Sequence, residues 1–359
     1  MKKMFRLSYV VLLLTSLLTA CTIKDPQPIS SKYGKGVLVV NEGNFSDANG
    51  SLSFIKENNE VVNDIFQAEN SVALGGIVQF VKGYNLSNSN TIADKLAIIT
   101  NSIDQVVFTE ATDFKVVGVL DANGNAKQVE NPQAFATLGN KGYVTNWGDI
   151  NKAFGATPEG FITEIDLQTR AFLRKIPTNS RPQGIITVNN KLYVANSNTN
   201  TISVYNSNGN LTQTIIVANK PDKFLIDVNN KIWVICLASS NNTKGSLVQI
   251  NPFTDKTELS ILDVPTSTFN AKIAIYNNSI YSVSGSKIFS IDITTQTILE
   301  FISNDFSIYG FSINPQNGEL YLGEGSFSNA SRIRRISLEG KLIKEYLGGI
   351  GTNGFLFYR

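Results

Sequence analysis

The stretch RPQGIITVNNKLYVANSNTNTISVYNSNGNLTQTIIV, residues 181–217, determines how the rest of the chain is interpreted. Apolar and polar residues alternate in four short runs, at 184–188, 191–196, 201–206 and 211–217. The pair Asn189-Asn190 and the triplet Ser207-Asn208-Gly209 separate the first two and the last two runs, and both tolerate the positive φ of tight hairpin turns. β-branched and aromatic residues fill the runs. The stretch therefore predicts one sheet of four antiparallel strands.

The second strand of this unit recurs along the chain. Aligning its equivalents gives steps of 59, 46, 50, 40, 48 and 40 residues. The aligned positions are Leu38, Ala97, Tyr143, Tyr193, Trp233, Tyr281 and Tyr321. Such periods are typical of propeller blades with loops of variable length. We therefore predict an all-β fold, a seven-bladed β-propeller of four-stranded antiparallel blades.

The first unit has no inner strand before its second strand, because the turn-like Gly36 follows a polar segment directly. The missing run appears at the other end of the chain, where residues 354–358 (GFLFY) match residues 184–188 (GIITV). We therefore predict that the C-terminal strand joins the first blade. This closure would remove the free sheet edges on which other chains could pair.

Composition excludes several classes of function. The chain has 359 residues, 42% of them hydrophobic and only 17% charged, which suits strands and turns. It contains no histidine, which excludes Ser-His-Asp and Cys-His catalysis and nearly all catalytic zinc sites. Beyond residue 20, 28 basic residues face 29 acidic ones, so nonspecific nucleic-acid binding is not indicated. We expect a protein that is not an enzyme and has no cofactor or metal.

The N-terminus has the pattern of a lipoprotein signal. Basic residues 2, 3 and 6 precede an apolar run at 7–18, which is too short for a comfortable transmembrane helix. The run ends in Leu18-Thr19-Ala20-Cys21, which resembles the lipobox of bacterial lipoproteins; an ordinary secretory signal with a chance cysteine is the alternative. The predicted organisation is a signal peptide at 1–20, a flexible tether at 21–35 lipidated on Cys21, and a propeller at 36–359. The expected location is the outer membrane, anchored by lipid at the cell surface.

The remaining cysteine, Cys236, follows the apolar run 232–235. With Cys21 lipidated it has no partner for a disulfide. No histidine or other activating group accompanies it, so we expect a buried, unreactive thiol.

Loop lengths indicate which face of the propeller binds a ligand. In a four-stranded meander the second loop and the crossover to the next blade lie on one face, and the first and third turns lie on the other. Most long segments, such as 42–50, 147–160 and 324–330, belong to the crossover face. Because loops held by a rigid scaffold carry binding groups, we expect the site there.

Amide, carboxylate and aromatic side chains gather in these segments. Four asparagines recur where the second strands end, and amides both donate and accept hydrogen bonds. Aromatic rings supply contact area with little rotamer freedom to lose. The combination suits a bulky neutral ligand; alternatively, each asparagine caps its own turn. The predicted ligand-binding residues are Asn41, Glu42, Asn44, Phe45, Asn101, Asn146, Trp147, Asn196, Arg181, Tyr309, Glu324 and Phe327.

Two short motifs resemble known families. Lys191-Leu192-Tyr193-Val194-Ala195-Asn196 resembles the repeat of YncE-like seven-bladed propellers. Val39-Val40-Asn41-Glu42-Gly43-Asn44, after a lipobox, is similar to a Bacteroidota branch of surface lipoproteins that includes the BtuG-type proteins. This resemblance implies a receptor that captures a corrinoid (vitamin B12) and passes it to a TonB-dependent outer-membrane transporter.

Two other functions remain open from the sequence. Some propellers are calcium-dependent hydrolases or lactonases that hold the metal without histidine, and Glu42, Asn146 and Asn196 could imitate such a set. A protein-interaction scaffold is the other alternative.

Overall fold

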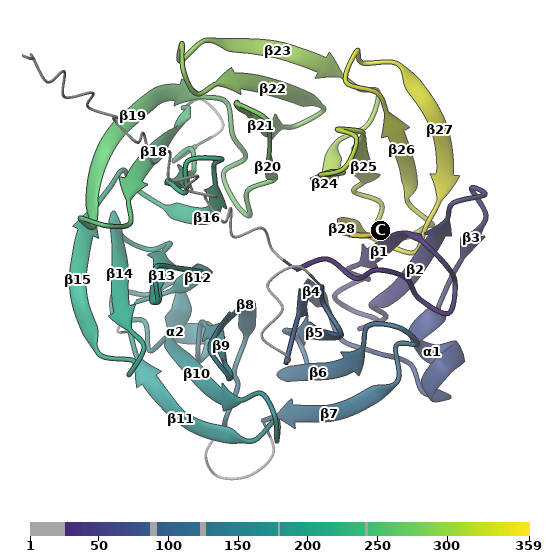
Figure 1. Cartoon of the computed structure of the whole chain (residues 1–359), viewed down its shortest axis with the longest axis horizontal. Helices are drawn as coiled ribbons and strands as arrows, with labels where there is room; N and C mark the ends of the chain where they lie inside the picture. Colours follow the sequence, from purple (N-terminus) through teal and green to yellow (C-terminus); the bar gives the residue numbers. More distant parts are fainter. Residues whose placement is uncertain (1–25, 87–91, 123–126, 179, 241–242) are drawn as a thin grey trace, which may run out of the picture.

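The computed structural model describes residues 26–86, 92–122, 127–178, 180–240 and 243–359. Its strands form seven four-stranded antiparallel sheets, arranged as a ring around a common axis (Figure 1). The predicted seven-bladed propeller is confirmed. We number the blades in chain order, so that blade 1 contains β1.

Each blade runs from an innermost strand at the axis to an outer strand at the periphery (Figure 1). Blade 1 consists of β28 (Thr352–Tyr358), β1 (Gly36–Asn41), β2 (Ser51–Lys56) and β3 (Val61–Val62). Blade 2 consists of β4 (Val78–Tyr84), β5 (Lys95–Thr100), β6 (Gln105–Glu110) and β7 (Val116–Asp121). Blade 3 consists of β8 (Pro132–Leu138), β9 (Lys141–Asn146), β10 (Phe161–Asp166) and β11 (Phe172–Pro177). Blade 4 consists of β12 (Pro182–Val188), β13 (Lys191–Asn196), β14 (Thr201–Asn206) and β15 (Leu211–Ile216).

The remaining blades have the same order. Blade 5 consists of β16 (Pro221–Ile226), β17 (Ile232–Cys236), β18 (Gly245–Asn251) and β19 (Lys256–Val264). Blade 6 consists of β20 (Ile273–Tyr276), β21 (Ser279–Ser284), β22 (Lys287–Asp292) and β23 (Ile298–Ser303). Blade 7 consists of β24 (Ile308–Ile313), β25 (Leu320–Glu324), β26 (Arg332–Ile336) and β27 (Leu342–Leu347).

Two short helices lie in the connections. Helix α1 (Ile65–Asn70) belongs to the crossover from blade 1 to blade 2, and α2 (Ile150–Ala153) belongs to the β9–β10 loop. Within the described part of the chain, no helix has the length and apolar character needed to cross a membrane.

Blade 4 shows how the local sequence specifies the sheet. Asn189 and Asn190 have φ values of 49° and 59°, the left-handed conformation that a two-residue hairpin requires. Strand β13 then pairs with β12 on one side and β14 on the other without a bulge against β14. The four strands predicted from residues 181–217 are therefore confirmed.

The core lies between the blades. Because successive side chains of a strand point to opposite faces, each sheet packs against both of its neighbours. In β13, Leu192 and Val194 pack against blade 3, whereas Tyr193 packs against blade 5. Seven clusters of buried apolar residues occupy the seven blade interfaces.

The two ends of the chain complete blade 1. Strand β28 pairs antiparallel with β1, placing Phe355 opposite Val39 and Phe357 opposite Val37. These residues join Tyr321 of blade 7 in one apolar cluster. The predicted closure by the C-terminal strand is confirmed, and it gives β1 a partner on its inner side.

Part of the segment predicted as a tether contacts the propeller. The Tyr33 ring lies 5.9 Å from that of Phe54 and 6.0 Å from that of Phe114. Lys32 forms an ion pair of 2.9 Å with Glu69 on α1. Residues 27–34 thus pack on blades 1 and 2. The predicted signal peptide and Cys21 lie outside the described residues.

Candidate functional site

The crossover face carries the loops between second and third strands and the connections between blades. Three of the asparagines predicted there, Asn41, Asn146 and Asn196, are 0–3% exposed. Each donates from Nδ2 to a hydroxyl on the adjoining strand: Asn41 to Ser53 at 2.8 Å, Asn146 to Thr163 at 3.0 Å, and Asn196 to Ser203 at 3.0 Å. This repeated hydrogen bond between an asparagine and a hydroxyl joins the second strand of the blade to the third.

The carbonyl oxygens of the same asparagines hold the neighbouring crossover. Asn146 Oδ1 accepts from the backbone amide of Glu130 at 3.0 Å, and Asn196 Oδ1 accepts from Ser180 Oγ at 2.7 Å. Asn41 Oδ1 accepts from Thr352 Oγ1 at 2.9 Å. The structure therefore places these three side chains inside the scaffold, where they join a neighbouring strand to a crossover. Asn101 differs, since it is half-buried and donates to Gln79 Oε1 at 3.2 Å.

A ring of polar residues surrounds the axis at the crossover end. In six of the innermost strands, the second residue of the strand occupies an equivalent position in its blade. In blade 6 the equivalent residue is the one just before β20. In β4, β8, β12, β16 and β24 the pairing shifts around this position, as at a β-bulge, which re-aims a side chain. We call these residues the axial ring: Gln79, Gln133, Gln183, Asp222, Lys272, Tyr309 and Asn353.

Sequence analysis identified only Tyr309 of this ring. The available signal was the dipeptide that opens three innermost strands: Pro132-Gln133, Pro182-Gln183 and Pro221-Asp222. The repeated positions of the second strands do not include this one.

Glu42 joins blade 1 to blade 7 beside the axial ring. Its Oε2 accepts from Tyr309 Oη at 2.8 Å and from Asn353 Nδ2 at 2.9 Å. Burial, and then the nearby Glu42 carboxylate, raise the pKa of Tyr309, which keeps the phenol protonated as a donor. The Tyr309 ring meets Phe327 edge to face at 5.0 Å, and Asn44 Nδ2 donates to the Phe327 carbonyl at 2.8 Å. Four predicted residues, Glu42, Asn44, Tyr309 and Phe327, are thus brought together.

A second cluster forms around Trp147, which is 6% exposed. Its Nε1 donates to Gln183 Oε1 of the axial ring at 3.0 Å. The Arg181 guanidinium lies over the rings of Trp147 and Phe154, at 5.2 and 4.5 Å, and donates to Ser197 Oγ at 3.0 Å. Phe269, on the crossover from blade 5 to blade 6, meets Trp147 at 6.0 Å. The predicted pair Trp147 and Arg181 therefore meets, with Phe154 and Phe269 beside it.

Charged side chains from blades 5 and 6 lie between these two clusters. Asp222 is 2% exposed and accepts from the backbone amide of Ala271 at 3.0 Å. Lys272 is 8% exposed, and its Nζ lies 4.7 Å from the centre of the Tyr309 ring. Burial, reinforced by the Lys223 ammonium, lowers the pKa of Lys272 to about 7. Burial also lowers the pKa of Lys223 and raises that of Asp222.

Exposed aromatic rings stand around this charged centre. Phe154, Phe269 and Phe327 are 61%, 53% and 41% exposed, although each contacts Trp147 or Tyr309. Phe45, in the β1–β2 loop, is 81% exposed. We call the first three rings the aromatic rim. Exposed aromatic side chains gathered around buried polar groups are a feature of binding surfaces.

Glu324, another predicted site residue, pairs with Arg332 at 3.0 Å. The hydrogen bond from Arg332 lowers the pKa of the Glu324 carboxyl and outweighs the opposing effect of burial. The set suggested for a metal is not assembled, because Asn146 and Asn196 are committed to their own blades. Among the described residues, no three His, Cys, Asp or Glu side chains gather as metal ligands. Cys236 is buried, and burial raises the pKa of its thiol to about 12, in agreement with the predicted unreactive cysteine.

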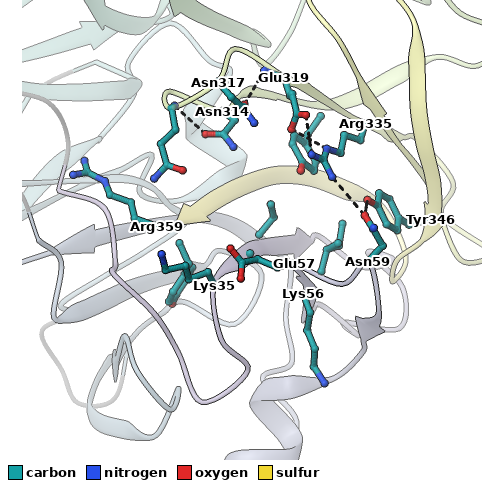
Figure 2. A pocket seen from close by; sticks show the side chains of 16 residues that line it. Lys35, Lys56, Glu57, Asn59, Asn314, Asn317, Glu319, Arg335, Tyr346 and Arg359 are labelled. Atoms are coloured by element: carbon teal, nitrogen blue, oxygen red, sulfur yellow. Dashed lines mark hydrogen bonds and ion pairs between the residues drawn. The ribbon is translucent and has the colours of Figure 1, made fainter.

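A cavity of about 350 Å³ lies on the opposite, tight-turn face, at the seam between blades 7 and 1 (Figure 2). Its polar groups largely bind one another. Arg335 Nη2 pairs with Glu319 Oε1 at 2.7 Å, and Asn59 Oδ1 accepts from Tyr346 Oη at 2.6 Å. Figure 2 shows these contacts along one wall, with Lys35 and Arg359 on the other side.

Comparison with known proteins identifies a family and a fold. Residues 35–347 match the family described as Domain of unknown function (DUF5074), and the chain belongs to that family. No curated protein sequence matches it.

Solved structures show similar propellers at low identity. A putative 6-phosphogluconolactonase from Bacteroides fragilis has a TM-score of 0.63 at 12% identity, covering 90% of this chain and 98% of that one. A functionally unknown protein from Desulfotomaculum acetoxidans has a TM-score of 0.62 at 14% identity, with coverages of 91% and 99%. A dihydro-heme d1 dehydrogenase in complex with DHE has a TM-score of 0.59 at 12% identity, with coverages of 90% and 68%. These differing descriptions, at such identities, support the fold alone.

Proposed function

We propose that this member of the DUF5074 family is a non-enzymatic receptor, anchored by lipid in the outer membrane at the cell surface. It binds a bulky, partly apolar small molecule on the crossover face and passes it to a TonB-dependent transporter. The observation that carries the proposal is the aromatic rim around the axial ring. Phe154, Phe269 and Phe327 offer apolar contact area, while buried polar groups at the axis offer orientation.

Rigid support favours binding at this place. The rim residues sit on crossovers and second loops, but Trp147 and Tyr309 beneath them are fixed by hydrogen bonds to Gln183 and Glu42. A preorganised surface loses little conformational entropy when a ligand binds, so more of its contact energy appears as affinity. Exposed rings in this setting gain by covering their surface, at roughly 25 cal/mol per Å² of apolar area.

A corrinoid is the specific ligand that we propose. It is large, rich in amides and partly apolar, and the Val39–Asn44 motif resembles the BtuG-type branch. Gln79, Gln133, Gln183 and Asn353 would supply side-chain amides at the axis to pair with amides of the ligand. Transfer to a transporter follows from the same resemblance.

Isothermal titration with cyanocobalamin tests the binding function. The wild-type protein is expected to bind, and the double variant Phe154→Ala, Phe269→Ala should lose at least tenfold in affinity, since about 1.4 kcal/mol of lost apolar contact suffices. Phe253→Ala is the matched control, because Phe253 is 77% exposed but lies in the β18–β19 turn on the tight-turn face. No heat with the wild-type protein would reject the corrinoid, and equal affinity of all three proteins would move the site off the rim.

Lipid anchoring requires a separate test. Metabolic labelling with an alkyne fatty acid should mark the wild-type protein and not Cys21→Ser, which should be released from membranes. A labelled or membrane-bound Cys21→Ser protein would contradict the anchor. Accessibility of the wild-type protein to an added protease on intact cells would then report the surface location.

A further inference from the structure

Two lysines at the crossover end of the axis have no carboxylate partner. Lys272 is 8% exposed, yet among the described residues neither the Lys272 nor the Lys223 ammonium group takes part in an ion pair or a hydrogen bond. The nearest group shown for Lys272 is the Tyr309 ring, 4.7 Å from Nζ. Charged side chains are seldom this buried unless they are paired, because removal from water costs several kcal/mol. An additional negative charge beside these two lysines would therefore be stabilised.

The carboxylates nearby are already engaged. Glu42 accepts hydrogen bonds from Tyr309 and Asn353, and Asp222 accepts one from the backbone amide of Ala271. Arg181 is the third basic side chain at this end of the axis. It donates a hydrogen bond to Ser197 Oγ and is attracted electrostatically by the Asp222 carboxylate. Three basic side chains therefore face two carboxylates at this end of the axis, and burial shifts the pKa values of Asp222, Lys223 and Lys272 toward their neutral forms, which an added anion would reverse for the lysines.

We propose that Lys272 and Lys223 bind an acidic group of the ligand, a carboxylate or a phosphate, while the aromatic rim covers its apolar part. This inference rests on the proposed function and specifies the chemistry of the ligand. A lysine ammonium is a compact point charge with three donors, so it suits either acid without demanding one geometry. The binding partner is therefore acidic, whereas the residue types alone suggested a neutral one.

A pair of fluorescent probes that differ only in the acid separates this inference from the proposed function. The probes are 1-pyrenebutyric acid and its neutral amide, followed by fluorescence anisotropy. Both should bind the rim, and the acid should bind about tenfold more tightly, the value of one charge-assisted hydrogen bond. Lys272→Gln and Lys223→Gln should each reduce that preference, whereas Lys272→Arg should retain it.

The preference should also depend on pH. The pKa of Lys272, about 7, is set by burial and by Lys223, against the opposing influence of Glu42 and Asp222, with Tyr309 protonated beside it. Between about pH 6 and about pH 8.5 the Lys272 ammonium loses its proton, so the wild-type preference for the acid should fall. In Lys272→Arg it should persist. Lys231→Gln, on the tight-turn face, is the control and should behave as wild type.

The outcomes are distinct. Equal binding of acid and amide to the wild-type protein overturns the acidic ligand and leaves the rim as a binding site. A preference that survives in both glutamine variants overturns the assignment to these lysines, and thermal melts of the variants exclude misfolding as a cause. Binding of neither probe overturns the acidic ligand held under the aromatic rim, whereas the titration with cyanocobalamin decides the proposed function separately. Displacement of pyrenebutyrate by inorganic phosphate or by acetate, at equal ionic strength, then distinguishes a phosphate from a carboxylate.

Discussion

Several half-buried cations of the tight-turn face pair with carboxylates, whereas among the described residues two lysines at the axis of the crossover face do not. Arg335 pairs with Glu319 at 2.7 Å, and Lys191 pairs with Asp255 at 2.6 Å. Lys223 and Lys272 have no such partner among the described residues, although Lys272 is more buried than either of those cations. Both faces are built by the same seven blades, so the scaffold does not require this difference.

The difference indicates how one repeat serves two purposes. At one end of the propeller, tight hairpins restrict the backbone. The ion pairs there are partly exposed to solvent and change the folding free energy little. At the other end the bulges of the innermost strands aim one side chain per blade toward the axis, where burial makes an unpaired charge costly. Such a cost is retained in proteins mainly where a group has a function.

The largest expected effect concerns the scaffold that both faces share. Deleting residues 354–359 removes most of β28, including Phe355 and Phe357 of the blade 1–blade 7 cluster and the buried Tyr358. We expect the protein to aggregate or to lose its cooperative thermal transition in circular dichroism, because blade 1 loses its inner strand. Deletion of Arg359 alone is the control. A soluble protein with an unchanged melting temperature would show that ring closure is dispensable.

A smaller effect is expected inside the crossover face, where scaffold and site can be separated. Asn146→Ala leaves the Glu130 amide without its acceptor and removes the bond to Thr163. The free energy of unfolding in urea should fall by about 1–3 kcal/mol, the cost of leaving buried polar groups unpaired. Asn208→Ala, at an exposed turn position, should change little. If Asn146→Ala kept full stability but lost ligand affinity, this asparagine would belong to the site after all.

Lys272 should change how stability depends on pH. Its pKa is about 7 in the folded protein and ~10.4 when unfolded, so between these values the unfolded chain binds more protons. Stability of the wild type should therefore rise with pH relative to Lys272→Met, by at most ~1.4 kcal/mol per pH unit, from about pH 7 to about pH 9. Urea titrations at several pH values measure the difference. If the free energies of unfolding of the two proteins changed in parallel with pH, the Lys272 ammonium would be exposed to solvent with an ordinary pKa.

The smallest effect is expected for an exposed pair on the tight-turn face. Lys231 pairs with Glu258 at 2.6 Å, with both side chains open to solvent. Because water and salt screen such pairs, Lys231→Gln should shift the melting temperature by no more than about 1 °C. A shift as large as that of Asn146→Ala would mean that the two faces do not differ in how their charges contribute.

The fold could be predicted because its determinants are local and repeated. Asn189-Asn190 fixes a hairpin by its φ values alone, and the alternation in residues 191–196 assigns each side chain to one neighbouring blade. Even the distant pairing of β28 with β1 could be predicted, because Gly36 opens a unit that lacks a strand and residues 354–358 supply one. Each of these signals is contained in a few consecutive residues.

The site could be predicted only in part. Glu42, Tyr309 and Phe327 do meet, and Trp147 meets Arg181. Asn41, Asn146 and Asn196 occupy equivalent places and have suitable chemistry, yet they lie inside the blades. There they accept hydrogen bonds from crossover groups that need a buried partner, such as the backbone amides of Gly349 and Glu130. The sequence repeat shows that these three asparagines are equivalent, but it does not show whether their side chains face the loops or the interior of the blade.

The sequence by itself determined the number of blades, the four-stranded repeat and the closure of the ring, because turn chemistry and alternation act over neighbouring residues. Tertiary structure alone decided that Gln133, Asp222, Lys272 and Asn353 share one end of the axis, since they come from four blades and meet only when the ring closes. It also decided that Lys272 is buried without a carboxylate partner among the described residues. Burial and charge pairing depend on every neighbour in space, and no stretch of sequence contains them.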